Sequence, residues 1–488
     1  MTLLLILILL PAVIGVISWF ISANKLRRQL WILTAFVHLA LSLQAALYPP
    51  QVPSSSWIGI DALSVIFLPL TSFLFFIVSV YGSGYVAREP ADQGPLPEEE
   101  GRLNNTSESV FTGTMLIFLA TMSMSILSQH LGMQWMAIEA TTLASAPLIY
   151  YHRNRNSLAA AWKYLILCSV GIAIALAGIF FLGLGLPAGM QDLTMSALLH
   201  NASLLNPRWL ELAFILMLVG YGTKMGLAPM HNWLPEAHSE ASSPVSALLS
   251  GSLLNCAFLG ILRIQQLNAA AGKALFGQEL LILFGLLSIG VASIFILGQT
   301  DYKRMLAYSS VEHMGILALG TGIGGLGALG AILHLINHSV AKTMLFLTAG
   351  NIHSRYHTKL ASHITGLGKS MPITGFLWLA GFLGVVASPP LGIFISEFTI
   401  IRAISSLGMW LVLGLLMLFL TLAFIGMANM FLKMYFGKPD VAVKRENRSG
   451  VIPIFILVVI LLALGFYVPH WLWQAISNAV QLIEGVKP

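Results

Sequence analysis

Apolar stretches long enough to cross a lipid bilayer recur from one end of the chain to the other, and this pattern restricts the fold more than any other feature. Apolar residues make up 57% of the chain and charged residues only 9%, whereas about a quarter of the residues in soluble globular proteins are charged. A helix needs about 20 mostly apolar residues to span the hydrocarbon core, where it satisfies its own backbone hydrogen bonds. The sequence therefore predicts an all-α, polytopic membrane protein.

Fourteen stretches of roughly this length are expected to be transmembrane helices. The first has no basic segment before it and no small-residue cleavage site after it, so we expect a membrane span and not a removed signal peptide. The expected spans cover residues 3–22, 30–48, 63–85, 111–128, 133–151, 159–184, 210–230, 245–264, 280–298, 303–320, 326–352, 372–401, 410–433 and 451–473.

Lysine and arginine residues are divided unevenly between the two sets of alternate loops. Seventeen of the 25 fall on one side of the expected topology and five on the other, while Lys163, Lys224 and Lys342 fall inside spans. Basic loops favour the cytoplasmic side of a membrane. The bias predicts a protein of the prokaryotic cytoplasmic membrane with both termini on the non-cytoplasmic side. It also explains the net charge of +6 without a nucleic-acid partner.

Two of the expected helices, the seventh and the twelfth, are interrupted by proline near a titratable residue. Pro229 follows Lys224 in the first, and Pro389 and Pro390 precede Glu397 in the second. Their spacing predicts two inverted five-helix repeats, helices 4–8 and 9–13, each with one broken helix. The expected domains are a three-helix segment with a polar, acidic cytoplasmic loop (1–108), the two repeats (109–265 and 276–434), and a last loop and helix (435–488).

Ionisable residues inside the expected spans are few, and each is costly at membrane depth unless it serves a function. Lys224 is expected to line an ion or substrate path, the alternative being a lysine that snorkels from a helix end. Glu139 needs a cation to stay charged, and Lys224 is its expected partner. The complete set is Glu139, Lys163, Lys224, Glu312, His313, His334, His338, Lys342 and Glu397.

His334, His338 and Lys342 are spaced four residues apart and therefore share one face of a helix. A single buried histidine is usually a satisfied core residue, but three titratable groups in a row favour a water-lined proton path. Histidines four residues apart can also chelate a metal. No glutamate follows His334 as in a metalloprotease, however, and Lys342 would repel a cation, so no metal site is expected.

The chain contains no dinucleotide fingerprint, phosphate-binding loop, CxxC pair, haem motif or nucleophile elbow. The sequence therefore predicts no redox or hydrolytic chemistry in this chain. Its two cysteines, Cys168 and Cys256, lie in apolar stretches and are expected to be small core residues.

Five motifs carry a resemblance to a known family: KMGLAP (224–229), HNWLPEA (231–237), SPVSALL (243–249), DYKRMLAYSS (301–310) and HLINHSVAK (334–342). They resemble the antiporter-like proton-pumping subunits of respiratory complex I. That family also includes Mrp-type Na⁺/H⁺ antiporters and membrane-bound hydrogenases, and the resemblance spans about 111–433. AHSEA (237–241), VEHMG (311–315) and the lack of a long C-terminal lateral helix are most similar to the F subunit of hydrogenase 4.

The resemblance implies roles for most of these ionisable residues. It implies a coupled pair of Glu139 and Lys224, and a titratable exit residue at Glu397. His334, His338 and Lys342 correspond to a histidine and lysine relay. The family commonly carries a lysine or histidine on the eighth helix, where this chain has Ser250 and Asn255. Because neither titrates, water held by these two side chains would have to bridge the two repeats, which are the two halves of the expected proton path.

These implications predict an H⁺- or Na⁺-translocating membrane subunit of a multisubunit oxidoreductase, such as a group 4 hydrogenase or a formate hydrogenlyase. No cofactor is expected in this chain. Fe–S clusters and a NiFe centre are expected in peripheral partner subunits, beside further membrane subunits and lipid. The alternatives are an Mrp-type antiporter, a subunit of an inorganic-carbon uptake system, and a scaffold that no longer conducts ions.

Overall fold

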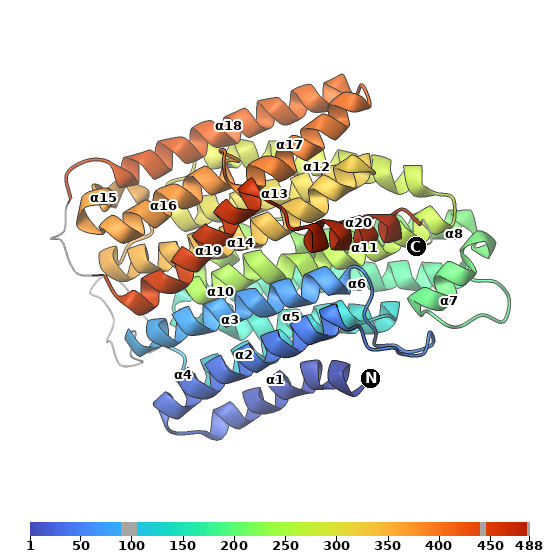
Figure 1. Ribbon diagram of the computed structural model, residues 1–488, viewed down its shortest axis with the longest axis horizontal. Helices are drawn as coiled ribbons and strands as arrows, with labels where there is room; N and C mark the ends of the chain where they lie inside the picture. The colour runs from blue at the N-terminus through green and yellow to red at the C-terminus, as the bar shows by residue number, and fades with distance from the viewer. Residues whose placement is uncertain (89–104, 440–445, 486–488) are drawn as a thin grey trace.

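The computed structural model describes residues 1–88, 105–439 and 446–485 as a bundle of helices that run side by side (Figure 1). Within these ranges there is no β-strand, only three isolated bridges. Both termini lie at one end of the bundle, here called the terminal face. The opposite end, where α3 (Ser64–Arg88) finishes and α15 (Leu367–Ser370) lies, is called the loop face. The all-α architecture is as predicted, and most of the predicted acidic loop lies outside the described residues.

The N-terminal helices α1 (Thr2–Phe20) and α3 both pack against α2 (Asn24–Leu47), and all three pack against α4 (Glu108–Leu127). A buried histidine joins all four. His38 Nε2 lies 3.0 Å from the Leu7 carbonyl oxygen and 3.0 Å from Ser123 Oγ, and its Nδ1 lies 3.0 Å from Ser72 Oγ. These contacts attach the first three helices firmly to the remainder of the bundle.

The next helices differ from the expected spans at the seventh and eighth. α8 stops at Met225, and a short helix, α9, follows after a non-helical segment at 226–233. The eighth span contains a π-helical turn at Leu249–Leu253, for which the sequence has no local signal. The elements are α5 (Leu131–Ile149), α6 (Arg155–Leu184), α7 (Met195–His200), α8 (Pro207–Met225), α9 (Leu234–Glu240), α10 (Ser243–Leu248) and α11 (Leu254–Ala270).

The twelfth span is broken as predicted, between α16 and α17. The last expected span was wrong, because its helix ends at Phe466 and a separate helix begins after Pro469. That last helix, α20, packs on both α11 and α14. The elements are α12 (Ala274–Leu297), α13 (Tyr302–Ile323), α14 (Leu326–Tyr356), α16 (Pro372–Val385), α17 (Gly392–Ser406), α18 (Trp410–Tyr435), α19 (Arg448–Phe466) and α20 (His470–Ile483).

Nine helices in the described part of the chain are long and apolar enough to cross a membrane. The other five expected spans correspond to α5, α8, α13, α14 and the α16–α17 pair. These five carry nearly all the ionisable residues singled out above. Two of the five are interrupted: one break follows α8, and the other lies between α16 and α17. The less apolar helices therefore hold the polar interior.

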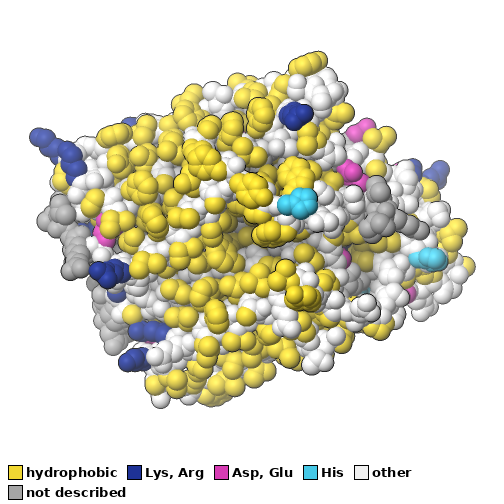
Figure 2. Space-filling model, viewed as in Figure 1, with side chains coloured by type: hydrophobic (Ala, Val, Ile, Leu, Met, Phe, Trp, Pro, Cys, Tyr) yellow, Lys and Arg dark blue, Asp and Glu magenta, His cyan; other side chains and the backbone are white. Residues whose placement is uncertain are grey.

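Apolar side chains cover the middle of the face seen in Figure 2, and lysine and arginine side chains lie mainly toward the loop face. Such a belt suits a lipid environment. Cys168 and Cys256 are buried and unbridged, as predicted.

Candidate functional site

Lys224 occupies the last turn of α8 and is fully buried. The helix ends here because Gly226 adopts a left-handed φ of +88°, and the amide of Leu227 donates back to the carbonyl of Gly222. A side chain at Gly226 would also collide with Leu234. The break therefore holds the ammonium group at a helix end inside the protein, which excludes the snorkelling alternative.

The ammonium group of Lys224 is surrounded by hydroxyl groups. Its Nζ donates to Thr142 Oγ1 at 2.8 Å and to Tyr164 OH at 2.5 Å, and it lies 4.5 Å from the centre of the Tyr164 ring. Thr142 Oγ1 in turn lies 3.3 Å from Glu139 Oε2, and Ser169 donates to Glu139 Oε1 at 2.6 Å. The Thr142 hydroxyl thus lies between Glu139 and Lys224, so the coupling of these two residues stays a prediction and would run through a hydroxyl group. Thr142 had no signal in the sequence.

Replacing Thr142 with valine is expected to slow proton transport about tenfold, less than the loss of a group that itself carries the proton. Valine keeps the shape of threonine but removes the hydroxyl that joins the carboxylate to the ammonium group. The measurement is proton uptake by vesicles that contain the purified complex. Thr141→Val is the matched control, since Thr141 is equally buried but donates at 2.6 Å to Ile138 of its own helix. Equal rates in the two variants would contradict the bridging role.

Lys163 lies on α6 inside the predicted span, but its side chain is on the surface of the chain. Its Nζ donates to Glu236 Oε1 at 2.6 Å, and the two side chains are 43% and 35% exposed on the chain's surface. The helix turns the next residue, Tyr164, inward to Lys224 instead. The structure therefore places Lys163 at the edge of the first-half site.

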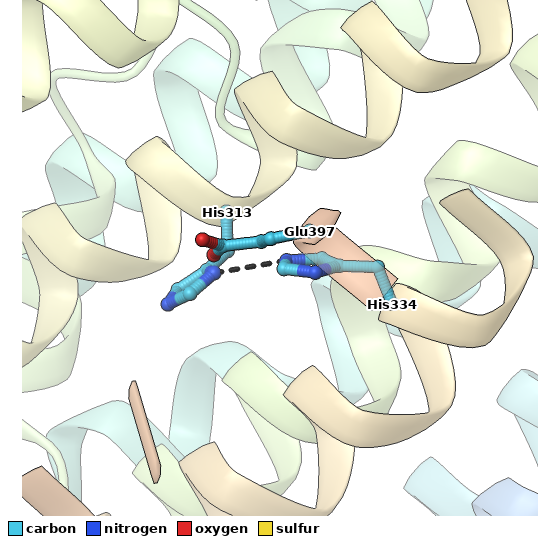
Figure 3. A group of neighbouring side chains, drawn as sticks. All are labelled: His313, His334 and Glu397. Carbon is cyan, nitrogen blue, oxygen red and sulfur yellow. Dashed lines mark hydrogen bonds between the residues drawn. The ribbon is translucent and has the colours of Figure 1, made fainter. Parts of the chain in front are cut away.

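A second buried site lies in the other half of the bundle, where α13, α14 and α17 meet. His313 Nδ1 lies 2.9 Å from His334 Nε2, and His334 Nδ1 lies 3.1 Å from Ser396 Oγ. Glu397 follows Ser396 on α17, just after the helix break, and is 8% exposed. In Figure 3 the side chains of His313, His334 and Glu397 point toward one another from these three helices. His313 is thus a central member of the site.

The same three residues are the group in the described chain whose ligand atoms approach closely enough to hold a metal, within 4.8 Å of one another. Two imidazoles and a carboxylate would suit Zn²⁺. Lys342, however, lies close enough for its charge to act on His313 and would oppose a cation there. The structure pairs His334 with His313 and not with His338, so the chelating pair considered from the sequence is not formed. The absence of a metal stays a prediction.

The predicted stripe on α14 is present, and all three of its members are fully buried. The His338 ring lies 5.1 Å from that of His313, and neither of its nitrogens has a hydrogen-bond partner among the described residues. Lys342 donates to the Leu306 carbonyl at 3.0 Å. Glu312 lies within electrostatic range of both Lys342 and Glu397.

Ser250 and Asn255 join the two halves directly. Ser250 Oγ lies 2.8 Å from Ser310 Oγ of α13, and Asn255 Nδ2 donates to Ser339 Oγ of α14 at 2.8 Å. Ser250 sits in the π-helical turn. The Oδ1 atom of Asn255 is buried without a hydrogen-bond partner in the described chain, as expected of a water-binding group.

His238 is a site residue that the sequence reasoning missed, although it lies in a quoted motif. It is fully buried on α9 and stacks on Phe346 of α14, with ring centres 4.9 Å apart. It lies within electrostatic range of Lys342 and His338. The segment that follows the break in α8 thus brings a titratable group against α14.

Residues 128–426 match the family described as "NADH:quinone oxidoreductase/Mrp antiporter, TM". The chain is 33% identical over 461 residues to the hydrogenase-4 component F homolog of Methylacidiphilum infernorum, covering 91% of this chain and 93% of that protein. Its fold is similar to that of one chain of an archaeal membrane-bound sulfane sulfur reductase, with a TM-score of 0.86 and 20% identity. The match covers 100% of this chain and 98% of that chain. The fold is also similar to that of one chain of the Mrp complex of Dietzia sp. (TM-score 0.84, 20% identity, 100% of both chains).

Proposed function

The chain belongs to the NADH:quinone oxidoreductase/Mrp antiporter family of transmembrane proteins, and on that premise we propose that it moves protons across a membrane as a subunit of a hydrogenase-type complex. One observation carries this function. Buried titratable and hydroxyl side chains lie inside both halves, and Ser250, Asn255 and His238 of the first contact α13 and α14 of the second. Such groups are costly at membrane depth unless an ion uses them.

The proposed path begins at Glu139 and Lys224, with Thr142 and Tyr164 as hydroxyl links. Water held by Ser250 and Asn255, together with His238, passes the proton between the halves. The second half then carries it to the break in α17. Its members are His338, Lys342, Glu312, His313, His334 and the release residue Glu397. Lys163 and its partner Glu236 mark the edge of the uptake side.

The repeat organisation belongs to the same proposal. α4 packs on α5, and α6 packs on α8; correspondingly α12 packs on α13, and α14 packs on α16 and α17. This correspondence supports fourteen spans with inverted repeats at 109–265 and 276–434, between the segments 1–108 and 435–488. The basic side chains near the loop face support a cytoplasmic location for that face and a non-cytoplasmic location for both termini (Figure 2).

Redox chemistry is proposed to occur on partner subunits that hold Fe–S clusters and a NiFe centre, in line with the relative named hydrogenase-4 component F. The Mrp-type antiporter is the second candidate, favoured by the matching family and by the fold of the Dietzia complex. Purification of the tagged chain with identification of its partners separates the two. Hydrogenase and Fe–S subunits, with proton uptake during their turnover, would support the proposal; small Mrp-type subunits alone would overturn it.

Replacing Asn255 with leucine is expected to slow proton transport, because leucine cannot hold the water that bridges the halves. Asn255→Lys should keep transport, since it places a titratable group at the same point. Proton uptake by vesicles containing each variant complex is the measurement. Unchanged uptake in the leucine variant would mean that protons do not cross here.

A further inference from the structure

Arg263 lies inside α11 near the terminal face, and its side chain is only 1% exposed. Its Nη1 donates to Asp61 Oδ2 at 2.9 Å and to Gln129 Oε1 at 3.3 Å, and Nη2 reaches the Ile126 carbonyl at 3.5 Å. Asp61 precedes α3 and is 19% exposed. A buried ion pair therefore sits just beneath the terminal face, and Arg263 is its more deeply buried member.

Asp61 remains charged beside it. Burial acts to raise the pKa of Asp61, but the Arg263 guanidinium and hydrogen bonds from Ser64 and Gln129 outweigh burial and lower it below its ordinary value. Both Ser64 donors lie 2.8 Å from Asp61 Oδ1, and Gln129 Nε2 lies 3.2 Å from Oδ2. The pair thus holds Arg263 in place.

Buried polar groups continue from this pair toward Lys224. Tyr221 precedes Lys224 by one turn of α8, and its ring lies against Gly260, one turn before Arg263 on α11. The Tyr221 hydroxyl and Arg263 Nε are buried and have no hydrogen-bond partner within the described ranges. Gln134 on the neighbouring α5 is equally buried, and both ends of its amide are unpartnered. Buried polar groups of this kind normally bind water, so this part of the first half is a polar seam.

A wet seam from Lys224 to the terminal face would let protons leave the first half without reaching the second. A fixed positive charge at the outer end of such a seam repels protons and other cations, as arginines do in selective pores. We propose that Arg263 is the electrostatic barrier that closes this seam, so that protons at Lys224 pass to the second half. This inference rests on the proposed proton path.

A purely structural role for the pair makes a different prediction. If Arg263 and Asp61 only attach α11 to the segment before α3, removing either partner should have the same effect. A barrier depends on the charge of Arg263 and not on the pair. Asp61→Asn keeps the guanidinium with its Gln129 and Ile126 contacts, whereas Arg263→Gln removes the charge.

The test is passive proton permeability after a pH jump, in vesicles that contain the complex without electron donor. We expect Arg263→Gln to raise the leak several-fold over the wild type, and Asp61→Asn and Arg263→Lys to leave it low. Arg263→Met serves as a second neutral variant if glutamine impairs assembly. Adding Lys224→Ala to Arg263→Gln should abolish the extra leak, because the leak starts at Lys224.

Wild-type leak in both neutral variants would overturn the barrier, and so would equal leaks in Arg263→Gln and Asp61→Asn. Donor-driven proton uptake by the wild type, measured in the same vesicles, keeps the two proposals apart. Uptake without a variant leak contradicts only the barrier, whereas no uptake contradicts the proposed function itself.

Discussion

Replacing Lys224 with alanine is expected to lower the rate of proton transport about a hundredfold or more, while the complex still assembles. The ammonium group is the buried cation that contacts both Thr142 and Tyr164, and alanine leaves these hydroxyl groups without a proton donor. Lys224 lies one residue before the end of α8, so the substitution does not interrupt the helix. The measurement is proton uptake per assembled complex in vesicles.

Lys273→Ala is the control for this variant. Lys273 pairs with Glu211 at 2.8 Å, and both side chains are about one-third exposed. The loss of such a pair changes stability by about 1 kcal/mol or less and should leave uptake unchanged. Normal uptake in assembled Lys224→Ala complex would remove Lys224 from the path.

Replacing Glu397 with glutamine is expected to lower the rate of proton release about a hundredfold, although the side chain keeps its size. Glu397 lies just beyond the break in the twelfth span, with ligand atoms of His313 and His334 within 4.8 Å. An amide can accept and donate hydrogen bonds there but cannot carry the proton away. Protons should therefore collect on the histidines, and net uptake should cease.

Glu279→Gln is the control here, because Glu279 is an exposed carboxylate on α12 of the same half. We expect it to behave as the wild type. If Glu397→Gln transports normally, release does not pass through this carboxylate.

Much of this arrangement follows from local rules. Prolines at 229, 389 and 390 predicted where two helices break, because proline cannot continue a helix without disruption. The spacing of His334, His338 and Lys342 predicted one buried stripe, because residues four apart share a helix face. Both predictions depend only on residues near in sequence.

The contacts between helices could not be obtained in this way. His313 and His334 are 21 residues apart and meet only when α13 packs on α14. The direction in which the Lys163 side chain points could not be predicted, because α6 is apolar all round, and a helix without a polar face does not show which side turns outward. Thr142 and His238 were missed because threonine and histidine are common in ordinary cores, and only their neighbours distinguish them.

Both halves are proposed to serve one proton path in series. The most direct test measures proton uptake in Lys224→Ala, in Glu397→Gln and in the double variant, in vesicles with equal amounts of complex. A series path predicts that each single variant already falls to the level of the double variant. Single variants that each keep about half of the wild-type uptake, with none in the double variant, would show two independent routes and contradict the account.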